Sequence, residues 1–288
     1  MKATSRRSAL ALGAGALLSV AVQGTASASN VTQQLRDLER EHGARLGVFA
    51  FDPRTGASVR YRADERFPMC STFKTLAAAA VLHRGISVDK RVFYTQEDVD
   101  KSKYAPKTKY HVADGMTIEE LCSAAISFSD NCAGNLLLRE LGGPTEVTSF
   151  CRHTGDFVTR LDRWEPELNT AEPWRITDTT TPRAIGRTYA KIALGRVLQP
   201  QDRERVMGWL LANTTSLNRF RKGLPADWRL ADKTGSGDYG TANDVGITWP
   251  PGRGPLVLSV LTTKPDPQAP RDEELVARTA AVLAAELS

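Results

Sequence analysis

The chain has 288 residues, of which 41% are hydrophobic and 25% are charged, and its formal net charge is +5 at pH 7. This composition is typical of a globular protein, and the length allows one large domain, or two closely packed lobes, with a sizeable core. No block of lysine and arginine follows residue 28, which argues against nucleic acid as a partner.

Residues 1–28 have the pattern of a cleaved export signal. The twin-arginine pair Arg6-Arg7 precedes the apolar segment Ala9–Val22, and Ala26-Ser27-Ala28 has the small-x-small pattern of a signal-peptidase site. The apolar segment is too short, and too rich in glycine and alanine, for a transmembrane anchor. We therefore expect a secreted, extracytoplasmic protein without stable membrane association, cleaved after Ala28. The twin-arginine route is expected, with general secretion as the alternative. Loss of this segment lowers the net charge to +2, because it contains three basic residues and no acid.

The mature chain begins with a predicted helix and a predicted β-hairpin. The helix, Val31–His42, has leucines on one face. Two short runs of alternating polarity, Arg45–Phe51 and Ser58–Arg62, then flank a strong turn signal at Asp52–Gly56.

Helices dominate from Phe73 to about Leu211. The first follows Cys70–Lys74, is rich in alanine and leucine, and is ended by Gly85, which places Ser71 at or near its N-terminus. The other predicted helices are Thr117–Ile126, which opens with a capping box, Asn135–Leu141, Thr145–Thr154, Pro182–Leu198 and Asp202–Ala212.

Strands return near the C-terminus. Arg229–Lys233, Thr241–Trp249 and Leu256–Thr263 have the length and β-branching of strands, with glycine- and proline-rich turns between them. Arg271–Leu287 is amphipathic and is predicted to be a closing helix.

Strands at both ends of the chain, with helices between them, predict an α/β fold of the α+β type. We expect an antiparallel sheet of about five strands, built from both termini and flanked by helices, with an inserted all-helical domain. Residues 29–62 and 213–288 are assigned to the α/β domain, and residues 63–212 to the helical domain.

The four cysteines are Cys70, Cys122, Cys132 and Cys151. An even number in an exported protein usually favours disulfides, but a chain of this size does not need them. Ten residues of continuous helix would hold Cys122 and Cys132 roughly 15 Å apart, beyond bridging range. We expect no disulfide.

Lys74 lies three residues after Ser71, on the same predicted helical face, with its ammonium in reach of the serine hydroxyl. A neighbouring lysine is one way to activate a serine nucleophile. Alone, however, this spacing is more typical of an N-cap serine and a surface lysine, because such pairs are frequent by chance.

Three further clusters carry polar groups suited to catalysis. Ser129-Asp130-Asn131 lies between two helices, Glu165 and Asn169 lie in a long loop, and Lys233-Thr234-Gly235 ends a strand before Ser236. Taken singly, they are more typical of a helix cap, a surface loop and a strand exit.

In this order, the four clusters resemble the signature of the class A serine β-lactamases. The resemblance covers essentially the whole mature chain. It also includes Asp114–Thr117, Thr159–Trp164 and Asp178–Pro182. It implies the fold shared by these enzymes and the penicillin-binding transpeptidases, hydrolysis of penicillins and cephalosporins, and antibiotic resistance.

The resemblance implies a role for each matching residue. Ser71 would attack the lactam carbonyl and form an acyl-enzyme, and the backbone N–H groups of Ser71 and Ser236 would form an oxyanion hole. Ser129, assisted by Lys233, would pass a proton to the departing nitrogen. Either Lys74 or Glu165 would be the base for acylation.

Deacylation would depend on a water molecule that Glu165 and Asn169 hold and activate. The family holds the Glu165–Pro166 bond cis. Arg163 and Asp178 would pair across the neck of an Ω-loop, residues 163–178, and keep Glu165 in place.

The remaining implied positions bind substrate. Asn131 would contact the side-chain amide of the lactam, and Tyr104 would form a wall of the cleft. Lys233, Thr234, Gly235 and Ser236 would bind its carboxylate. Many members add an arginine from the strand after this motif to bind the carboxylate. Here that strand has no arginine, and Arg219 matches the position from which another branch of the family supplies it.

In the family, a structural disulfide, when present, joins the Cys122 position to one that Ala78 occupies here. A second type of bridge starts from the Cys70 position, and its partner position is at or near Gly237. Both pairings lack their second cysteine in this chain. No cofactor or metal is implied, the partner is a small-molecule β-lactam, and a monomer is expected.

The closest alternatives are a penicillin-binding D,D-peptidase and a non-hydrolysing β-lactam sensor, which share the serine and lysine motifs. Glu165 with Asn169 argues against both. A Ser-His-Asp hydrolase lacks its Gly-x-Ser-x-Gly motif, and no histidine pair has the spacing of zinc ligands. The sequence leaves open which lactams are preferred, whether carbapenems are hydrolysed, and which inhibitors bind.

Overall fold

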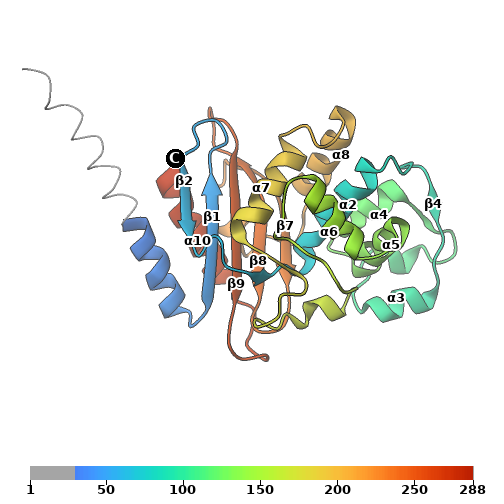
Figure 1. Cartoon of the computed structure of the whole chain (residues 1–288), viewed down its shortest axis with the longest axis horizontal. Helices are drawn as coiled ribbons and strands as arrows, with labels where there is room; N and C mark the ends of the chain where they lie inside the picture. The colour runs from blue at the N-terminus through green and yellow to red at the C-terminus, as the bar shows by residue number, and fades with distance from the viewer. Residues whose placement is uncertain (1–29, 288) are drawn as a thin grey trace, which may run out of the picture.

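The computed structural model describes residues 30–287, so the predicted export signal lies outside the described residues. Its centre is a five-stranded antiparallel sheet with the strand order β2-β1-β9-β8-β7 (Figure 1). The strands are β1 (Arg45–Phe51), β2 (Ser58–Tyr61), β7 (Arg229–Ser236), β8 (Ala242–Trp249) and β9 (Leu256–Thr263). The predicted sheet, built from both ends of the chain, is confirmed.

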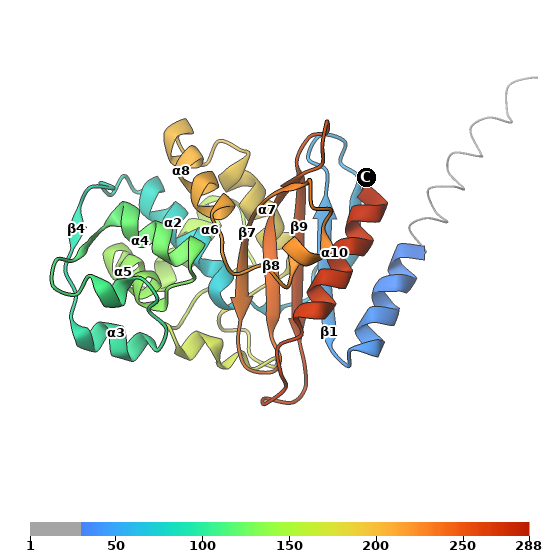
Figure 2. The same ribbon diagram turned by 180° about the vertical axis from the view of Figure 1, so that it is seen from behind.

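The two faces of the sheet are covered by different helices, because alternate residues of a strand point to opposite sides. In β9, Leu256, Leu258 and Val260 pack with the helix of residues 30–41 and with α10 (Glu273–Leu287), which lie side by side (Figure 2). Val257 and Leu261 of the same strand belong to the core on the opposite side, where α7 (Pro182–Ala193) crosses the sheet.

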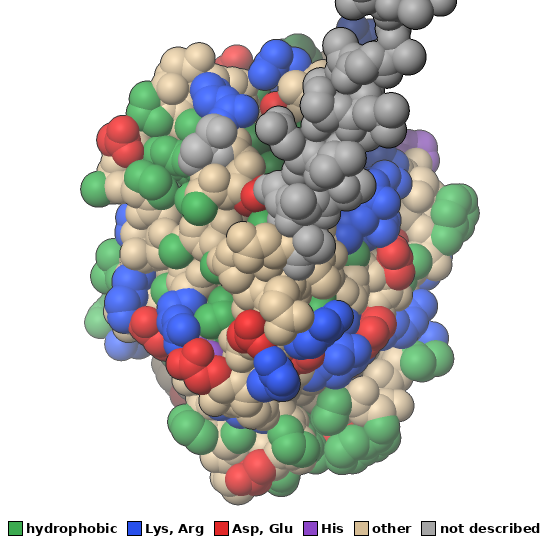
Figure 3. All heavy atoms as spheres, turned by 90° about the vertical axis from the view of Figure 1, so that its left-hand side faces the viewer, with side chains coloured by type: hydrophobic (Ala, Val, Ile, Leu, Met, Phe, Trp, Pro, Cys, Tyr) green, Lys and Arg blue, Asp and Glu red, His purple; other side chains and the backbone are tan. Residues whose placement is uncertain are grey.

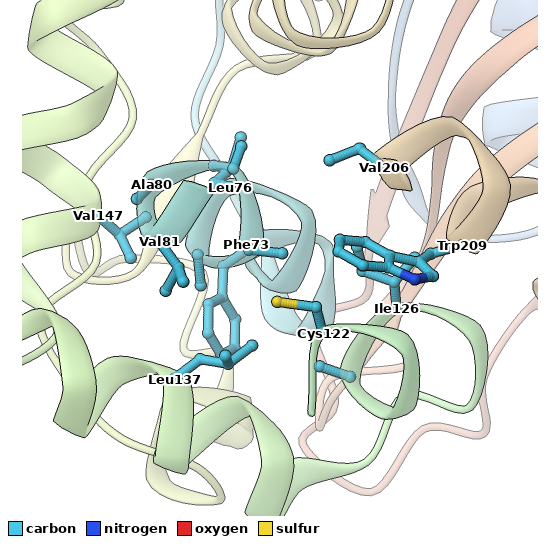
Figure 4. Packing of buried hydrophobic residues seen from close by; sticks show 14 of the residues in the cluster. Phe73, Leu76, Ala80, Val81, Cys122, Ile126, Leu137, Val147, Val206 and Trp209 are labelled. Atoms are coloured by element: carbon cyan, nitrogen blue, oxygen red, sulfur yellow. The ribbon is translucent and has the colours of Figure 1, made fainter. Parts of the chain in front are cut away.

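The helical part of the chain is built around α2 (Phe73–His83), whose residues 73–82 are all buried. A helix that is apolar on every side must be surrounded, and the side chains of neighbouring helices enclose Phe73, Leu76 and Val81 (Figure 4). Helix α2 packs against α4 (Ile118–Ser127), α5 (Asn131–Leu141), α6 (Thr145–His153), α8 (Pro200–Leu211) and α7, and α3 (Gln96–Ser102) packs against α5.

Short elements connect the two parts. A 3-10 turn, η1 (Cys70–Thr72), leads into α2, and α9 (Phe220–Gly223) precedes β7. Two small two-stranded ladders join β3 (Phe67–Pro68) to β6 (Thr179–Thr180), and β4 (Arg91–Val92) to β5 (Met116–Thr117); η2 (Thr108–Tyr110) and η3 (Glu167–Thr170) are further 3-10 turns.

Several predicted helix boundaries were wrong. Helix α5 begins at Asn131 rather than Asn135, because the Asp130 carboxylate caps it by accepting a hydrogen bond from Ala133 N. Helix α7 ends at Ala193 rather than Leu198, just before Gly195, a residue type that commonly ends helices.

The last helix, α10, begins at Glu273 rather than Arg271. Helix α3 was not predicted at all. It is short and largely polar, and it is held by a capping box between Thr95 and Asp98.

No described helix is both long and apolar enough to cross a membrane. At the end of the molecule that carries β2 and the helix of residues 30–41, basic side chains lie among acidic ones (Figure 3). Arg62 pairs there with Glu39, and Arg278 with Glu41. All four cysteines are buried free thiols.

Candidate active site

Ser71 lies in η1, immediately before α2, where it is 7% exposed. The turn packs directly against β7. A Cβ atom at Gly235 would lie 2.7 Å from the Met69 carbonyl oxygen and 3.3 Å from the Cys70 Cβ. Only glycine allows this approach, so Gly235 of the Lys-Thr-Gly motif lets the strand lie beside the serine.

The Lys74 ammonium is fully buried beside Ser71 and faces four oxygen atoms. Its Nζ lies 2.9 Å from Ser71 Oγ, 2.8 Å from the Ser129 carbonyl oxygen and 2.6 Å from Asn131 Oδ1. It also forms an ion pair with Glu165 Oε1 at 3.0 Å. All four atoms accept, so Lys74 is placed as a donor at the centre of the site.

Glu165 comes from the Ω-loop and reaches the same serine. Its Oε1 accepts from Ser71 Oγ at 3.2 Å, and its Oε2 accepts from Asn169 Nδ2. The Glu165–Pro166 peptide bond is cis, as expected. Asn135 in α5 clamps the backbone, since its Oδ1 accepts from Glu165 N at 2.9 Å and its Nδ2 donates to Glu165 O at 2.8 Å.

The neck of the Ω-loop is closed by Arg163 and Asp178. Arg163 Nε donates to Asp178 Oδ2 at 2.5 Å, and Asp178 Oδ1 accepts from the backbone N–H groups of Asp162 and Arg163. Arg163 also contacts Glu172, and burial of the Asp178 side chain to 1% exposure protects the pair from water.

Ser129 and Lys233 form the other side of the centre. Ser129, in the turn between α4 and α5, has a φ of 57° and lines the cleft beside Ser71. Lys233 Nζ donates to Ser129 Oγ at 3.0 Å and to Thr234 O at 2.9 Å. Burial, together with the charge of Lys74, lowers the pKa of the Lys233 ammonium well below its usual value.

Arg219 lies next to Ser236, although it is distant from the motif in sequence. One guanidinium nitrogen donates to Gly235 O and Asn243 O, each at 2.8 Å, and another donates to Ser236 Oγ at 2.6 Å. The side chain also pairs with Glu273 in α10 at 3.1 Å. Arg219 therefore fixes the end of β7 and presents a positive charge to the same end of the cleft.

Ser71, Ser129 and Arg219 line one cleft of about 270 Å³. Tyr104 lines it with half of its surface exposed. Asn131 also lines the cleft, while its Nδ2 donates to Ser102 O. The lining includes Ser71, Ser129, Asn169, Arg219, Thr234, Gly235 and Ser236.

Sequence reasoning missed four residues at the site. Thr215, Arg271 and Glu273 line the cleft, and Asn135 holds Glu165 from behind. Asn135 lies four residues after Asn131 on the same face of α5. A helix predicted to begin at Asn131 would therefore have placed Asn135 on the side of the site. Nothing local marks the other three, because they reach the cleft through the packing of α9 and α10.

Among residues 30–287, no group of three or more His, Cys, Asp or Glu side chains is arranged to hold a metal ion. The centre contains two serines, two lysines, a glutamate and amide groups, which are suited to nucleophilic and acid–base chemistry.

The chain matches the model of the β-lactamase enzyme family over residues 30–287. It is 59% identical to a β-lactamase of Streptomyces lavendulae, over 98% of this chain and 97% of the relative. Its structure is similar to that of a β-lactamase from Streptomyces albus G, with a TM-score of 0.88, 58% identity and coverage of 90% of this chain and 100% of the other. It is also similar to a variant of the last common ancestor of Gram-negative bacteria β-lactamase class A, with a TM-score of 0.86, 50% identity and coverage of 90% and 98%. The chain therefore belongs to the β-lactamase enzyme family and, within it, to the class A serine β-lactamases.

Proposed function

We propose that this protein hydrolyses the lactam amide bond of penicillins, and of cephalosporins as a second class, and so confers resistance to these antibiotics. The observation that carries the proposal is the placement of Glu165. One of its oxygens faces Ser71 Oγ at 3.2 Å, while its other oxygen is held by Asn169.

In the acylation step, Ser71 Oγ attacks the lactam carbonyl carbon and its proton passes to Glu165. The contacts support Glu165, rather than Lys74, as the acceptor, because Lys74 faces four acceptors and acts as a donor. The carbon–nitrogen bond of the lactam then breaks, and Ser129 gives its proton to the nitrogen. The proton on Glu165 passes by way of Lys74 to Ser129, so that Glu165 is a carboxylate again before deacylation. Lys233, in contact with Ser129 Oγ, stabilises the charge that develops there.

In the deacylation step, a water molecule attacks the ester carbon. Glu165 takes one proton of this water, the ester bond to Ser71 Oγ breaks, and that oxygen regains a proton. Asn169 and Asn135 fix the carboxylate for this step. Two donors, the backbone N–H groups of Ser71 and Ser236, bind the carbonyl oxygen in both steps, and each is typically worth about 3–4 kcal/mol of barrier.

At the other end of the cleft, the carboxylate of the lactam is bound by Thr234, Ser236 and the charges of Lys233 and Arg219. Asn131 and Tyr104 contact its side chain. We propose further that residues 1–28 export the protein, by the twin-arginine route, and that it acts outside the cytoplasm as a monomer without nucleic acid as a partner.

The test is to mix the purified protein with a penicillin, following ring opening by absorbance and the protein by intact mass. Many turnovers without a lasting adduct are expected, and Ser71→Ala should abolish them. Consumption of one equivalent, with a persistent acyl mass on Ser71, would identify a D,D-peptidase or a sensor instead.

A further inference from the structure

Two carboxylic acids outside the cleft are buried side by side beneath Lys233. Asp232 in β7 is 2% exposed, and Asp244 in β8 is fully buried. In the antiparallel register Asp232 lies opposite Gly246, and Thr234 lies opposite Asp244. The two aspartates are thus diagonal neighbours on the same face of the sheet, within reach of one another.

Both acids contain an oxygen atom without a donor. Asp232 Oδ2 and Asp244 Oδ1 are buried and receive no hydrogen bond, although Asp244 Oδ2 accepts from Phe220 N at 3.2 Å. Buried polar atoms are rarely left unpaired, and two adjacent carboxylates could not both stay ionised in this environment. A single proton between the two free oxygens would remove both problems.

Burial favours that proton, although the nearby cations Arg219 and Lys233 oppose it. Burial raises the pKa of both carboxyls, and the negative charge of Asp232 raises the pKa of Asp244 further. Arg219 and Lys233 are the cations that act on the pair, Asn213 and Ser216 face Asp232, and Tyr189 approaches from α7. Together these contacts place the proton on Asp244 and leave Asp232 as the acceptor.

We propose that Asp232 and Asp244 share one proton and act as a single negative charge that keeps Lys233 an ammonium against Ser129. The two aspartates touch neither substrate nor the reacting atoms, so they are positioning residues. Their effect on Lys233 rests on the proposed function, whereas the shared proton does not.

The consequence for Lys233 follows from its surroundings. Burial, Lys74 and Arg219 all disfavour its charge, and the aspartate pair opposes them. With the ammonium retained, Lys233 donates to Ser129 Oγ and supports proton delivery to the lactam nitrogen. Without it, a neutral amine would be left in the carboxylate-binding end of the cleft.

Infrared spectroscopy tests the shared proton without any substrate. At neutral pH the wild-type protein should show the C=O stretch of a buried protonated carboxyl. Asp232→Asn and Asp244→Asn should each lose that band, whereas Asp227→Asn, an exposed control just before β7, should keep it. A wild-type spectrum without the band would overturn the proposal, whether or not the protein hydrolyses penicillin.

The pH profile of kcat/KM tests the single charge. In either single Asn variant the remaining aspartate should carry the one negative charge, so the basic limb should remain at its wild-type position. The double variant should move that limb down by about one to three pH units, the usual effect of losing an opposite charge nearby. A partial shift in each single variant, with the two shifts adding up to that of the double variant, would mean two independent charges and would refute the shared proton.

These two readouts separate the inference from the proposed function. A wild-type protein that shows the band but no penicillin turnover would refute the proposed function and support the shared proton. If the double variant does not fold, the wild-type band and the two single variants still decide the matter.

Discussion

Substitution of Glu165 by glutamine should stop deacylation while leaving acylation measurable. The two side chains have the same shape, so the glutamine oxygen can still accept from Asn169, and Asn135 can still clamp the backbone. The amide cannot take a proton from water. We therefore expect the acyl-enzyme on Ser71 to form and then persist.

The size of the effect follows from the contacts that the substitution removes. General-base assistance is worth about 10²–10⁴ in rate, which corresponds to about 3–5 kcal/mol of barrier for deacylation. The ion pair between Lys74 and Glu165 is also lost, but Lys74 keeps its contacts to Ser71, Asn131 and the Ser129 carbonyl. The ammonium is therefore not left without partners, and the fold should survive.

The assay combines rapid-mixing absorbance with intact mass. Glu165→Gln should give one turnover per molecule, slower than acylation of the wild type because Glu165 also takes the Ser71 proton, followed by a far slower steady state, with the acyl mass present throughout. Glu167→Gln is the matched control, because Glu167 lies in the same loop but is exposed. Turnover of Glu165→Gln within tenfold of wild type would refute the assignment of Glu165 as the base. If acylation of Ser71 is lost as well, no other group can replace Glu165 as the base for acylation.

Three further substitutions test the supports of the cleft. Arg219→Ala should raise KM for carboxylate-bearing lactams by about 10–100-fold, the loss of one charge-assisted hydrogen bond, and unchanged kinetics would remove this arginine from the site. Asp178→Asn should weaken the ion pair with Arg163, lower stability by about 1–3 kcal/mol in thermal unfolding and slow deacylation; an unaltered melting curve would contradict the role of the neck. Gly237→Ala puts a Cβ atom 2.7 Å from the Asn169 carbonyl oxygen, so penicillin hydrolysis should fall by up to about 10²-fold, and wild-type rates would show that the loop moves aside without cost.

The sequence predicted the strands of the sheet well, except that Arg229–Lys233 was too short, because β7 continues through the Lys-Thr-Gly motif to Ser236. Leu256–Thr263 was predicted to the residue, since a continuous apolar run between turns leaves little choice of ends. The start of α5 was missed because it depends on one capping contact of Asp130 rather than on periodicity. Motif order identified the residues around Ser71, whereas spacing alone did not.

What the sequence could not reveal depends on register and on packing between distant segments. Arg219 reaches Ser236 only because α9 lies against the ends of β7 and β8. Asp232 and Asp244 are neighbours only in one register of that strand pair, and a slip of one residue would put one of them on the other face. Nothing local to either aspartate indicates which register forms.

The charges of the described site follow a simple balance. Lys74 is paired with Glu165, and Arg219 with Glu273. If Asp232 and Asp244 together carry one negative charge, Lys233 is balanced as well, and the three buried cations face three negative charges. A pair with two negative charges would leave this end of the cleft with an excess that repels the substrate carboxylate, and a neutral pair would leave Lys233 uncompensated in a buried position. With a single shared proton, the charges of the buried cations are balanced, and this end of the cleft can still bind the carboxylate of the lactam.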